Sequence, residues 1–474
     1  MKTTCYLSTE LSCELQGAEF GDKRLNKRLG KIVDAVSTRP SEGLPDAVGS
    51  TAALEGLYRF LRNEKVEHDK ILTPHFEQTT QRCIEAKNVL IISDTSIFCF
   101  AVDPKNPKTK REGLGPITRD KQGFFSHFAL AVSQAEAMPL GVLGLETFVR
   151  TGKKGKRSCK EAQTDPSRES CKWLRVAEGV DKRIAGKANA IHLADREADF
   201  YEFLNYFVDN NQKCIVRVQY NRRLHPDEEV RLMNEKLQSL DSVYEREVPL
   251  SPRKVTRLKE NSSSHPARGY RLANLSFSAC PVELICSKHL QGKCNDSLKL
   301  NLVHVQELNC SENNEPIDWK LLTTEAIETT EQIVQIVDNY RKRWTIEEYF
   351  KALKSGCLYE ERQLESLDTL LNALAIFIPV AWKLLLMRSL AKTKPDESAC
   401  LVLTKIQIEI MKACSKRKLP EINTVKDALY AVAGMGGHIR NNGTPGWQVL
   451  GRGYQRLLMY EVGWLAAMER CDLS

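Results

Sequence analysis

One stretch of the chain combines acidic, basic and phenolic side chains at helical spacing. It runs from residue 340 to 354, contains no Pro or Gly, and consists largely of good helix formers. At about 100° per residue, five side chains share one narrow face: Tyr340, Arg343, Glu347, Lys351 and Lys354. Glu348 lies off this face, so Glu347 is the better candidate for a functional acid. The face suits a metal-binding carboxylate among phosphate-binding cations, but a solvated helix with ion pairs four residues apart is the alternative interpretation.

Two further acids follow short apolar runs. The run 89–93 has the β-branched composition of a buried strand and is followed by Asp94; the run 190–194 is followed by Asp195. A carboxylate at the end of a buried strand is held rigidly and can still reach a cleft, although an acid in this position more often caps a turn or helix. Because a divalent cation at a phosphoryl centre is held by several oxygens, these two acids and Glu347 together predict a metal site.

The spacing of the first stretch is also a family signature. Tyr, two residues, Arg, three residues, Glu, six residues and Lys is typical of one class of bacterial cut-and-paste transposases, and this chain fills it with Tyr340, Arg343, Glu347 and Lys354. The sequence resembles the insertion-sequence family IS-four in segments that follow the family's order: 21–24, 58–63, 195–199 and 343–348. The resemblance implies an RNase H-like core with an Asp-Asp-Glu triad, here Asp94, Asp195 and Glu347.

The predicted fold class is α/β. An RNase H-like catalytic core, a mixed sheet flanked by helices, is expected at 76–365, with an antiparallel β insertion at about 220–315. The insertion is suggested by apolar and polar residues that alternate at 273–279 and 298–302. Residues 1–75 and 366–474 are predicted to be helical, and the resemblance implies that the first domain binds DNA ends and that the second is a dimerisation domain.

Length and composition fit a soluble protein of several domains. The chain has 474 residues, and its net charge of +8 permits a nucleic-acid partner without establishing one. The 15 cysteines are scattered without a zinc-like spacing, and no apolar leader is seen, which predicts reduced thiols in a cytoplasm. The most apolar segment, 373–382, is predicted to be a buried helix, with no membrane partner.

The N-terminal domain carries cations on one side of a predicted helix. Between residues 23 and 31 they fall within an arc of about 140°, opposite apolar side chains. Such a face can contact the DNA backbone or can be merely solvated. The resemblance favours recognition of transposon ends, with these candidate DNA-binding residues: Lys23, Arg24, Lys27, Arg28, Tyr58, Arg59 and Arg62.

Two more DNA contacts are implied by the resemblance. Arg217, on a predicted strand at 214–218, would face bound DNA; an ion-paired arginine at a strand end is the alternative. Trp319 lies at the family's distance before Tyr340 for a tryptophan that stacks on a flipped base, whereas a Trp packed in the core is the alternative. The basic segment 153–160 either contacts phosphates or is a solvated loop.

The predicted activity is metal-dependent phosphoryl transfer on DNA. Two Mg²⁺ ions, or Mn²⁺ in their place, would be held by Asp94, Asp195 and Glu347. Phosphates would be bound by Tyr340, Arg343, Lys351 and Lys354.

The resemblance adds a reaction course and an assembly. It implies nicking at terminal repeats, hairpin formation, hairpin opening and strand transfer into target DNA. The double-stranded DNA would be held by a homodimer, for which an apolar stripe at 454–465 is the candidate contact, although core packing explains such a stripe equally well. A nuclease that cuts without joining, and a non-catalytic DNA-binding regulator, are the alternative functions.

Overall fold

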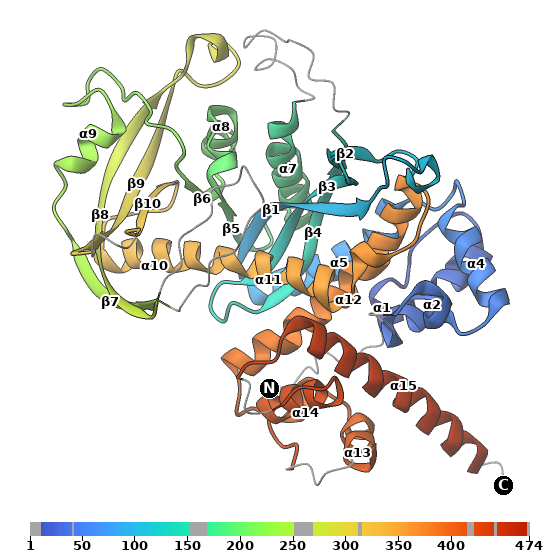
Figure 1. The fold of residues 1–474 in the computed structure, drawn as a ribbon. Helices are drawn as coiled ribbons and strands as arrows, with labels where there is room; N and C mark the ends of the chain where they lie inside the picture. Colours follow the sequence, from blue (N-terminus) through green and yellow to red (C-terminus); the bar gives the residue numbers. More distant parts are fainter. Residues whose placement is uncertain are drawn as a thin grey trace. The chain divides into compact units, whose positions relative to one another are not determined.

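The structure is a computed structural model that describes residues 11–39, 42–150, 168–250, 269–310, 315–414, 421–439 and 443–471 (Figure 1). The basic segment 153–160 lies outside the described residues. The chain forms two compact units, neither of which is contiguous in sequence. Unit one comprises Met1–Arg157, Val176–Asn189 and Trp344–Ser474, and unit two comprises Ser158–Arg175 and Ala190–Arg343.

The described part of unit one contains an antiparallel sheet in which β3 (Lys121–Ser133) pairs with β1 (Asn88–Ala101), β2 (Gly115–Thr118) and β4 (Pro139–Phe148). The aliphatic run at the start of β1 is fully buried, as its composition predicts. Strand β1 continues past Asp94 to Ala101, so the half-buried Asp94 lies inside the strand and not at its end. Phe128 of β3 lies opposite it in the register of the two strands.

The described part of unit one also contains these α-helices: α1 (Leu11–Glu14), α2 (Lys23–Thr38), α3 (Leu44–Val48), α4 (Thr51–Leu61), α5 (His68–Ala86), α11 (Thr345–Lys351), α12 (Leu367–Thr393), α13 (Lys405–Cys414), α14 (Val425–Met435) and α15 (Trp447–Cys471). Helix α7 (Lys172–Ile184) begins among residues of unit two and ends among those of unit one. Helix α12 is long and apolar enough to cross a membrane, but the whole of its apolar window is buried inside the protein. It packs against α5 and β4, as expected of a core helix.

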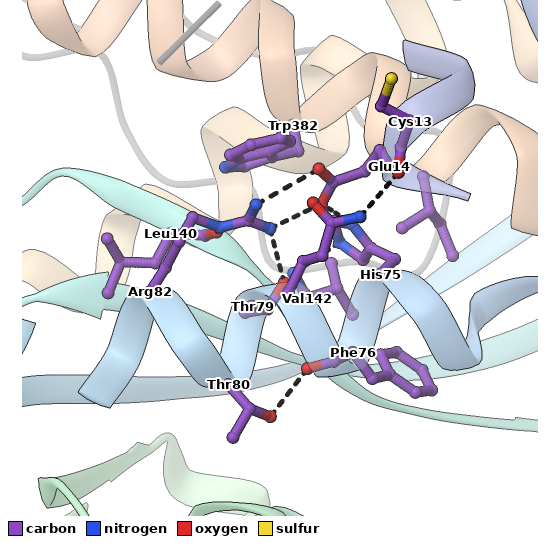
Figure 2. Close-up of polar contacts among 12 residues, drawn as sticks. Cys13, Glu14, His75, Phe76, Thr79, Thr80, Arg82, Leu140, Val142 and Trp382 are labelled. Atoms are coloured by element: carbon purple, nitrogen blue, oxygen red, sulfur yellow. Dashed lines mark hydrogen bonds and ion pairs between the residues drawn. The ribbon is translucent and has the colours of Figure 1, made fainter. Parts of the chain in front are cut away.

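A buried polar network in unit one joins α1 to α5 (Figure 2). The Glu14 carboxylate accepts hydrogen bonds from Arg82 Nη2 at 2.6 Å and from His75 Nδ1 at 2.7 Å. The backbone N–H of Val142 donates to His75 Nε2 at 3.0 Å, so the imidazole is neutral with its proton on Nδ1. The Arg82 guanidinium also lies 4.3 Å from the ring centre of Trp382 on α12. The network therefore ties the start of the described chain to the sheet and to the central helix of its own unit.

Unit two contains a mixed set of parallel and antiparallel strands (Figure 1). Its strand order is β5 (Asn189–Ala194), β6 (Lys213–Arg217), β10 (Asp318–Thr323), β9 (Ser297–Leu308), β8 (Arg271–Ile285) and β7 (Tyr244–Leu250). Strands β5 and β6 are parallel, and the remaining pairs in this order are antiparallel. The alternating segments at 273–279 and 298–302 lie in β8 and β9, so the strands of the predicted insertion continue one sheet with β6.

The described helices of unit two cover this sheet. Helix α8 (Tyr201–Asp209) packs against β6 and β9, and α10 (Thr330–Arg341) packs against β8 and β9. The short helix α9 (Met233–Gln238) follows β6 along the chain. A sheet flanked by helices is the mixed α/β architecture that the sequence predicts.

Candidate active site

The stretch from Tyr340 to Lys354 is not the single α-helix that its composition predicts. Helix α10 ends at Arg341, Lys342–Trp344 form a 3₁₀ turn, α11 covers Thr345–Lys351, and Ala352–Gly356 form a π-helical turn. The prediction of one uninterrupted helix was therefore wrong. A 3₁₀ turn is tighter than an α-helix and a π turn is wider, and π turns are frequent at functional sites.

Asp195 lies at the carboxyl end of β5 in unit two. It caps the 3₁₀ turn Arg196–Ala198, with its Oδ1 accepting the backbone N–H of Glu197 at 2.9 Å. Burial raises the pKa of this carboxyl, while the hydrogen bond from Glu197 and the charges of Arg343 and Lys172 oppose the rise. Asp195 therefore does cap a turn, which was the alternative interpretation of its position, and the cap holds its carboxyl near Arg343 and Lys172.

An aromatic and basic cluster surrounds Asp195 in unit two. The rings of Trp319 and Tyr340 meet edge to face, with centroids 5.6 Å apart, and the Arg217 guanidinium lies 5.9 Å from the centre of the Trp319 ring. The charges of Arg343, Arg217 and Asp195 all act on the Tyr340 hydroxyl. The structure therefore brings together five predicted site residues: Asp195, Arg217, Trp319, Tyr340 and Arg343.

The Tyr340 hydroxyl has an unusual position in this cluster. It is buried beside Arg343, yet it makes no well-aligned hydrogen bond to any described residue. A buried hydroxyl without a partner costs stability, so such a group invites a ligand that can complete its hydrogen bonding. Burial also raises the pKa of Tyr340, so the group stays a neutral donor.

Unit one holds the other two acids of the predicted triad, Asp94 and Glu347. Both are half-buried, and helix α11, which carries Glu347, packs against β1, which carries Asp94. The Asp94 Oδ1 accepts the backbone N–H of Thr95 at 2.7 Å. Phe128, opposite Asp94, contacts the rings of Tyr349 and Phe350, with centroids 5.8 and 5.5 Å apart. Aromatic packing thus fixes α11 on the strands that carry Asp94.

The two lysines of the signature region have different surroundings. Lys354 Nζ donates to the carbonyl oxygen of Ile97 on β1 at 2.5 Å and lies 5.2 Å from the centre of the Phe98 ring. Burial lowers the pKa of Lys354. Lys351 is more exposed and pairs with Glu348, with Nζ and Oε1 2.6 Å apart. In this structure Lys354 therefore ties the π turn to β1, whereas the Lys351 ammonium stays open to solvent.

A basic groove lies between α2 and α4 in unit one. The cations of α2 are exposed, and Leu29, Ile32 and Val33 are buried, as the helical spacing predicts. The groove is lined by Arg24, Arg28, Arg59 and Asn63 together with Asp22 and Glu55. The Arg28 guanidinium rests against Gly56, where no side chain would fit without displacing it.

Other predicted DNA-binding residues of this region lie outside the groove. Lys23 and Lys27 are exposed on α2. The Arg62 guanidinium lies 5.9 Å from the centre of the Tyr58 ring and pairs with Glu365 at 2.7 Å. The structure thus gathers Arg24, Arg28 and Arg59 but places Tyr58 and Arg62 in a separate contact.

Two family models match the sequence. One, described as Transposase DNA-binding, matches residues 11–66, and the other, described as Transposase DDE domain, matches residues 170–378. The chain therefore carries a transposase DNA-binding domain and a transposase DDE domain. The first match covers α1 to α4 with the basic groove. The second covers the cluster around Asp195 and the stretch from Tyr340 to Lys354, while Asp94 precedes it.

The three acids of the predicted triad can be tested for their fit to a divalent metal. Carboxylate oxygens are the ligands that Mg²⁺ and Mn²⁺ prefer, and Asp94, Asp195 and Glu347 are all half-buried, so the donor chemistry fits. Asp94 and Glu347 belong to unit one and Asp195 to unit two. Within the described residues, no group of three or more His, Cys, Asp or Glu side chains is gathered as a ready-made metal site.

The structure also points to residues that sequence reasoning missed. Trp344, on the 3₁₀ turn next to Arg343, is 56% exposed, which is unusual for so large an apolar side chain. Trp344 lies between the signature residues Arg343 and Glu347, and this position could have marked it as a candidate. Lys172, which is almost fully buried with its Nζ 3.2 Å from Glu197 Oε2, had no such signal, because an isolated lysine in a helix is usually exposed.

Proposed function

We propose that this protein is a cut-and-paste DNA transposase of the insertion-sequence family IS-four, related to the Tn-five transposase. It excises a transposable element at its terminal repeats, through nicking, hairpin formation and hairpin opening, and joins it to target DNA. The observation that carries the proposal is the cluster of Asp195, Arg343, Tyr340 and Trp319 inside the DDE-domain match. It combines an acid, a cation, a hydroxyl that lacks a well-aligned hydrogen bond and an aromatic ring, which are the groups that bind metal, phosphate and base.

The residues of the cluster and the two other acids of the predicted triad each have a role in this proposal. Asp94, Asp195 and Glu347 would hold Mg²⁺, or Mn²⁺ in its place, with two ions per active site. Such ions activate the attacking oxygen and stabilise the leaving oxygen of a phosphodiester. The Arg343 guanidinium binds a phosphate next to the acids, and the Tyr340 hydroxyl donates to the same group. The half-buried ring of Trp319, next to Arg217, offers a surface on which an extruded base stacks.

The signature lysines serve the same DNA in this proposal. Lys351, with its ammonium open to solvent, neutralises a phosphate. Lys354 reaches a phosphate from its place against β1, on the strand that carries Asp94.

The proposed domains follow the division predicted from sequence. Residues 1–75 bind the transposon end, 76–365 carry the chemistry, and 366–474 join two protomers on DNA. The first half of the apolar stripe on α15, with Tyr454 and Leu457, is buried, whereas Val462 and Leu465 are exposed. The exposed half, extended by Tyr460 and Met468, would be covered by a second copy of the chain in a homodimer. The protein would act in the cytoplasm.

The direct test is cleavage at the element's own terminal repeats in the presence of Mg²⁺. Fragments that end at the repeats are the expected products. DNA that is bound but stays intact, across Mg²⁺ and Mn²⁺ concentrations, would contradict the proposal.

Removing two cations of the groove is expected to weaken binding to all DNA sequences by a similar factor. In the variant Arg28→Ala/Arg59→Ala, the slope of log affinity against log salt should fall by about 0.9 for each lost phosphate contact. Fluorescence anisotropy with terminal-repeat DNA at several salt concentrations measures this slope. Lys412→Ala, which removes an exposed cation from α13, is the control and should leave the slope unchanged. An unchanged slope in the double variant would exclude the groove as a phosphate-binding surface.

The variant Tyr340→Phe is expected to change the cleavage rate without lowering the free energy of unfolding. Because the hydroxyl makes no well-aligned hydrogen bond to a described residue, its removal should leave the free energy of unfolding unchanged or slightly higher. Cleavage should slow by about 10- to 100-fold, which is the value of one hydrogen bond to a charged phosphate. Urea denaturation and a single-turnover cleavage assay measure the two effects. Cleavage at the normal rate would show that the hydroxyl does not contact DNA.

A further inference from the structure

Two adjacent glutamates of α11 have different surroundings. Glu347 belongs to the predicted triad, whereas Glu348 contacts other helices of unit one. Glu348 Oε2 accepts a hydrogen bond from Trp447 Nε1 on α15 at 3.1 Å and lies 3.8 Å from Arg388 Nη2 on α12. Its Oε1 pairs with Lys351 at 2.6 Å. Both oxygens of this carboxylate are therefore engaged, by three different partners.

The partners of Glu348 also contact each other. The Arg388 guanidinium lies 4.5 Å from the centre of the Trp447 ring, which is buried. Lys351, Arg388 and Trp447 thus face the Glu348 carboxylate from α11, α12 and α15. A carboxylate is a stronger acceptor for the indole N–H than a neutral oxygen, and it also attracts the guanidinium 3.8 Å away.

Helix α15 contacts the segment 345–356 at a second place. Gly451 of α15 lies so close to the backbone of Gly356, at the end of the π turn, that a Cβ on Gly451 would collide with the Gly356 carbonyl. Helix α15 therefore touches the segment 345–356 near its beginning, through Trp447, and at its end, through Gly451. The two contacts leave α11 little freedom to rotate or slide.

We infer that Glu348 is a positioning residue for Glu347. Held by Trp447 and Arg388, it sets the rotation of α11 about its axis. Because neighbouring residues on an α-helix differ in direction by about 100°, fixing Glu348 toward α12 and α15 fixes the direction in which Glu347 projects. The inference rests on the proposed function, in which Glu347 holds the metal ion. It adds that the C-terminal helix contributes to the geometry of that acid.

The experiment compares variants of the two glutamates and of Trp447 in the full-length chain. For each, we would measure the melting temperature, binding to terminal-repeat DNA, the single-turnover cleavage rate and the Mg²⁺ concentration that gives half of that rate. Glu348→Ala should bind DNA normally, cleave about 10- to 100-fold more slowly and need more Mg²⁺, because a misplaced acid weakens metal binding. Glu348→Gln keeps an oxygen acceptor for Trp447 and should lose less. Glu409→Ala, an exposed acid on α13, is the control.

Trp447→Phe provides an independent second variant. It keeps a ring over Arg388 but removes the N–H donor, so it should raise the Mg²⁺ requirement in the same direction. The double variant Glu348→Ala/Trp447→Phe should be no worse than Glu348→Ala alone, because both changes break one contact.

The outcomes separate this inference from the proposed function. Cleavage by Glu347→Gln at the normal rate would overturn both. If Glu347→Gln is inactive while Glu348→Ala cleaves with the normal rate and Mg²⁺ requirement, only the positioning role is wrong. If Glu348→Ala does not fold, Trp447→Phe decides: a raised Mg²⁺ requirement supports the role, and an unchanged one overturns it.

Discussion

Asp195→Asn is expected to abolish strand cleavage, by at least about 10³-fold, while terminal-repeat DNA is still bound. The substitution keeps the size of the side chain and its capping oxygen, but it removes the negative charge that holds a divalent cation. A gel assay for cleaved repeats and an anisotropy titration with the same DNA measure the two effects. The control is Asp241→Asn, an exposed acid of the same unit, which should cleave normally.

Asp195→Asn should be at least as stable as the parent protein. A loss of activity in this variant could then not be attributed to unfolding. Burial raises the pKa of Asp195 above its usual value of 3.8, so the folded protein favours the neutral form of this group. The charged carboxylate therefore costs stability at pH 7, and the cost disappears as the pH falls through the raised pKa toward 3.8. We expect Asp195→Asn to have an equal or higher free energy of unfolding at pH 7. Full cleavage activity in this variant would contradict the assignment of Asp195 to the triad.

Glu14→Gln is expected to have the largest effect on stability. The Glu14 carboxylate is buried between Arg82 and His75 (Figure 2), and the substitution leaves the Arg82 guanidinium without its counter-charge. Breaking a buried ion pair in this way costs about 3–5 kcal/mol. Urea denaturation at pH 7 measures the loss. The exposed Glu19, replaced by Gln, is the control in the same segment and should unfold as the parent protein does.

The pH dependence of this contribution follows from two groups. Burial would raise the pKa of Glu14, but the hydrogen bonds and charges of His75 and Arg82 lower it from 4.5 to about 2. Its stabilising effect is therefore complete above pH 4.5 and is lost as the pH falls toward 2. Burial also lowers the pKa of His75 below 6.5, so stability is lost as the pH falls below that value too. A difference between the parent and Glu14→Gln that disappears already between pH 7 and 4.5 would contradict this account.

The strands and the amphipathic helix could be predicted because their signals are local. The run before Asp94 is apolar on both faces, which only a buried strand explains at that length, and the cations of α2 follow the period of a helix. The break between Tyr340 and Gly356 could not be predicted, because the π turn packs against Gly451, far away in sequence. Composition favours a continuous helix there, and a tertiary contact overrides it.

Sequence signals pointed to some residues of the candidate site and not to others, because only some of their contacts are local in the chain. The signature spacing made Tyr340, Arg343 and Glu347 candidates, and the strand end made Asp195 one. The structure brings Tyr340, Arg343 and Asp195 together, while their function stays a prediction. The contacts of Glu348 with Arg388 and Trp447 join three helices, so no spacing along the chain reports them. The buried position of Glu14 was equally hidden, because an acid near the N-terminus is usually exposed.

The most direct test of the central claim is an assay for joined DNA. The full-length protein would be incubated with Mg²⁺, a fragment bounded by the element's own terminal repeats, and a supercoiled target plasmid. We predict an excised fragment and a product in which that fragment is covalently joined to the plasmid, both absent with Asp195→Asn. Cleaved fragment without joined product would indicate a nuclease, and binding with neither product would indicate a DNA-binding regulator; either result would contradict a transposase.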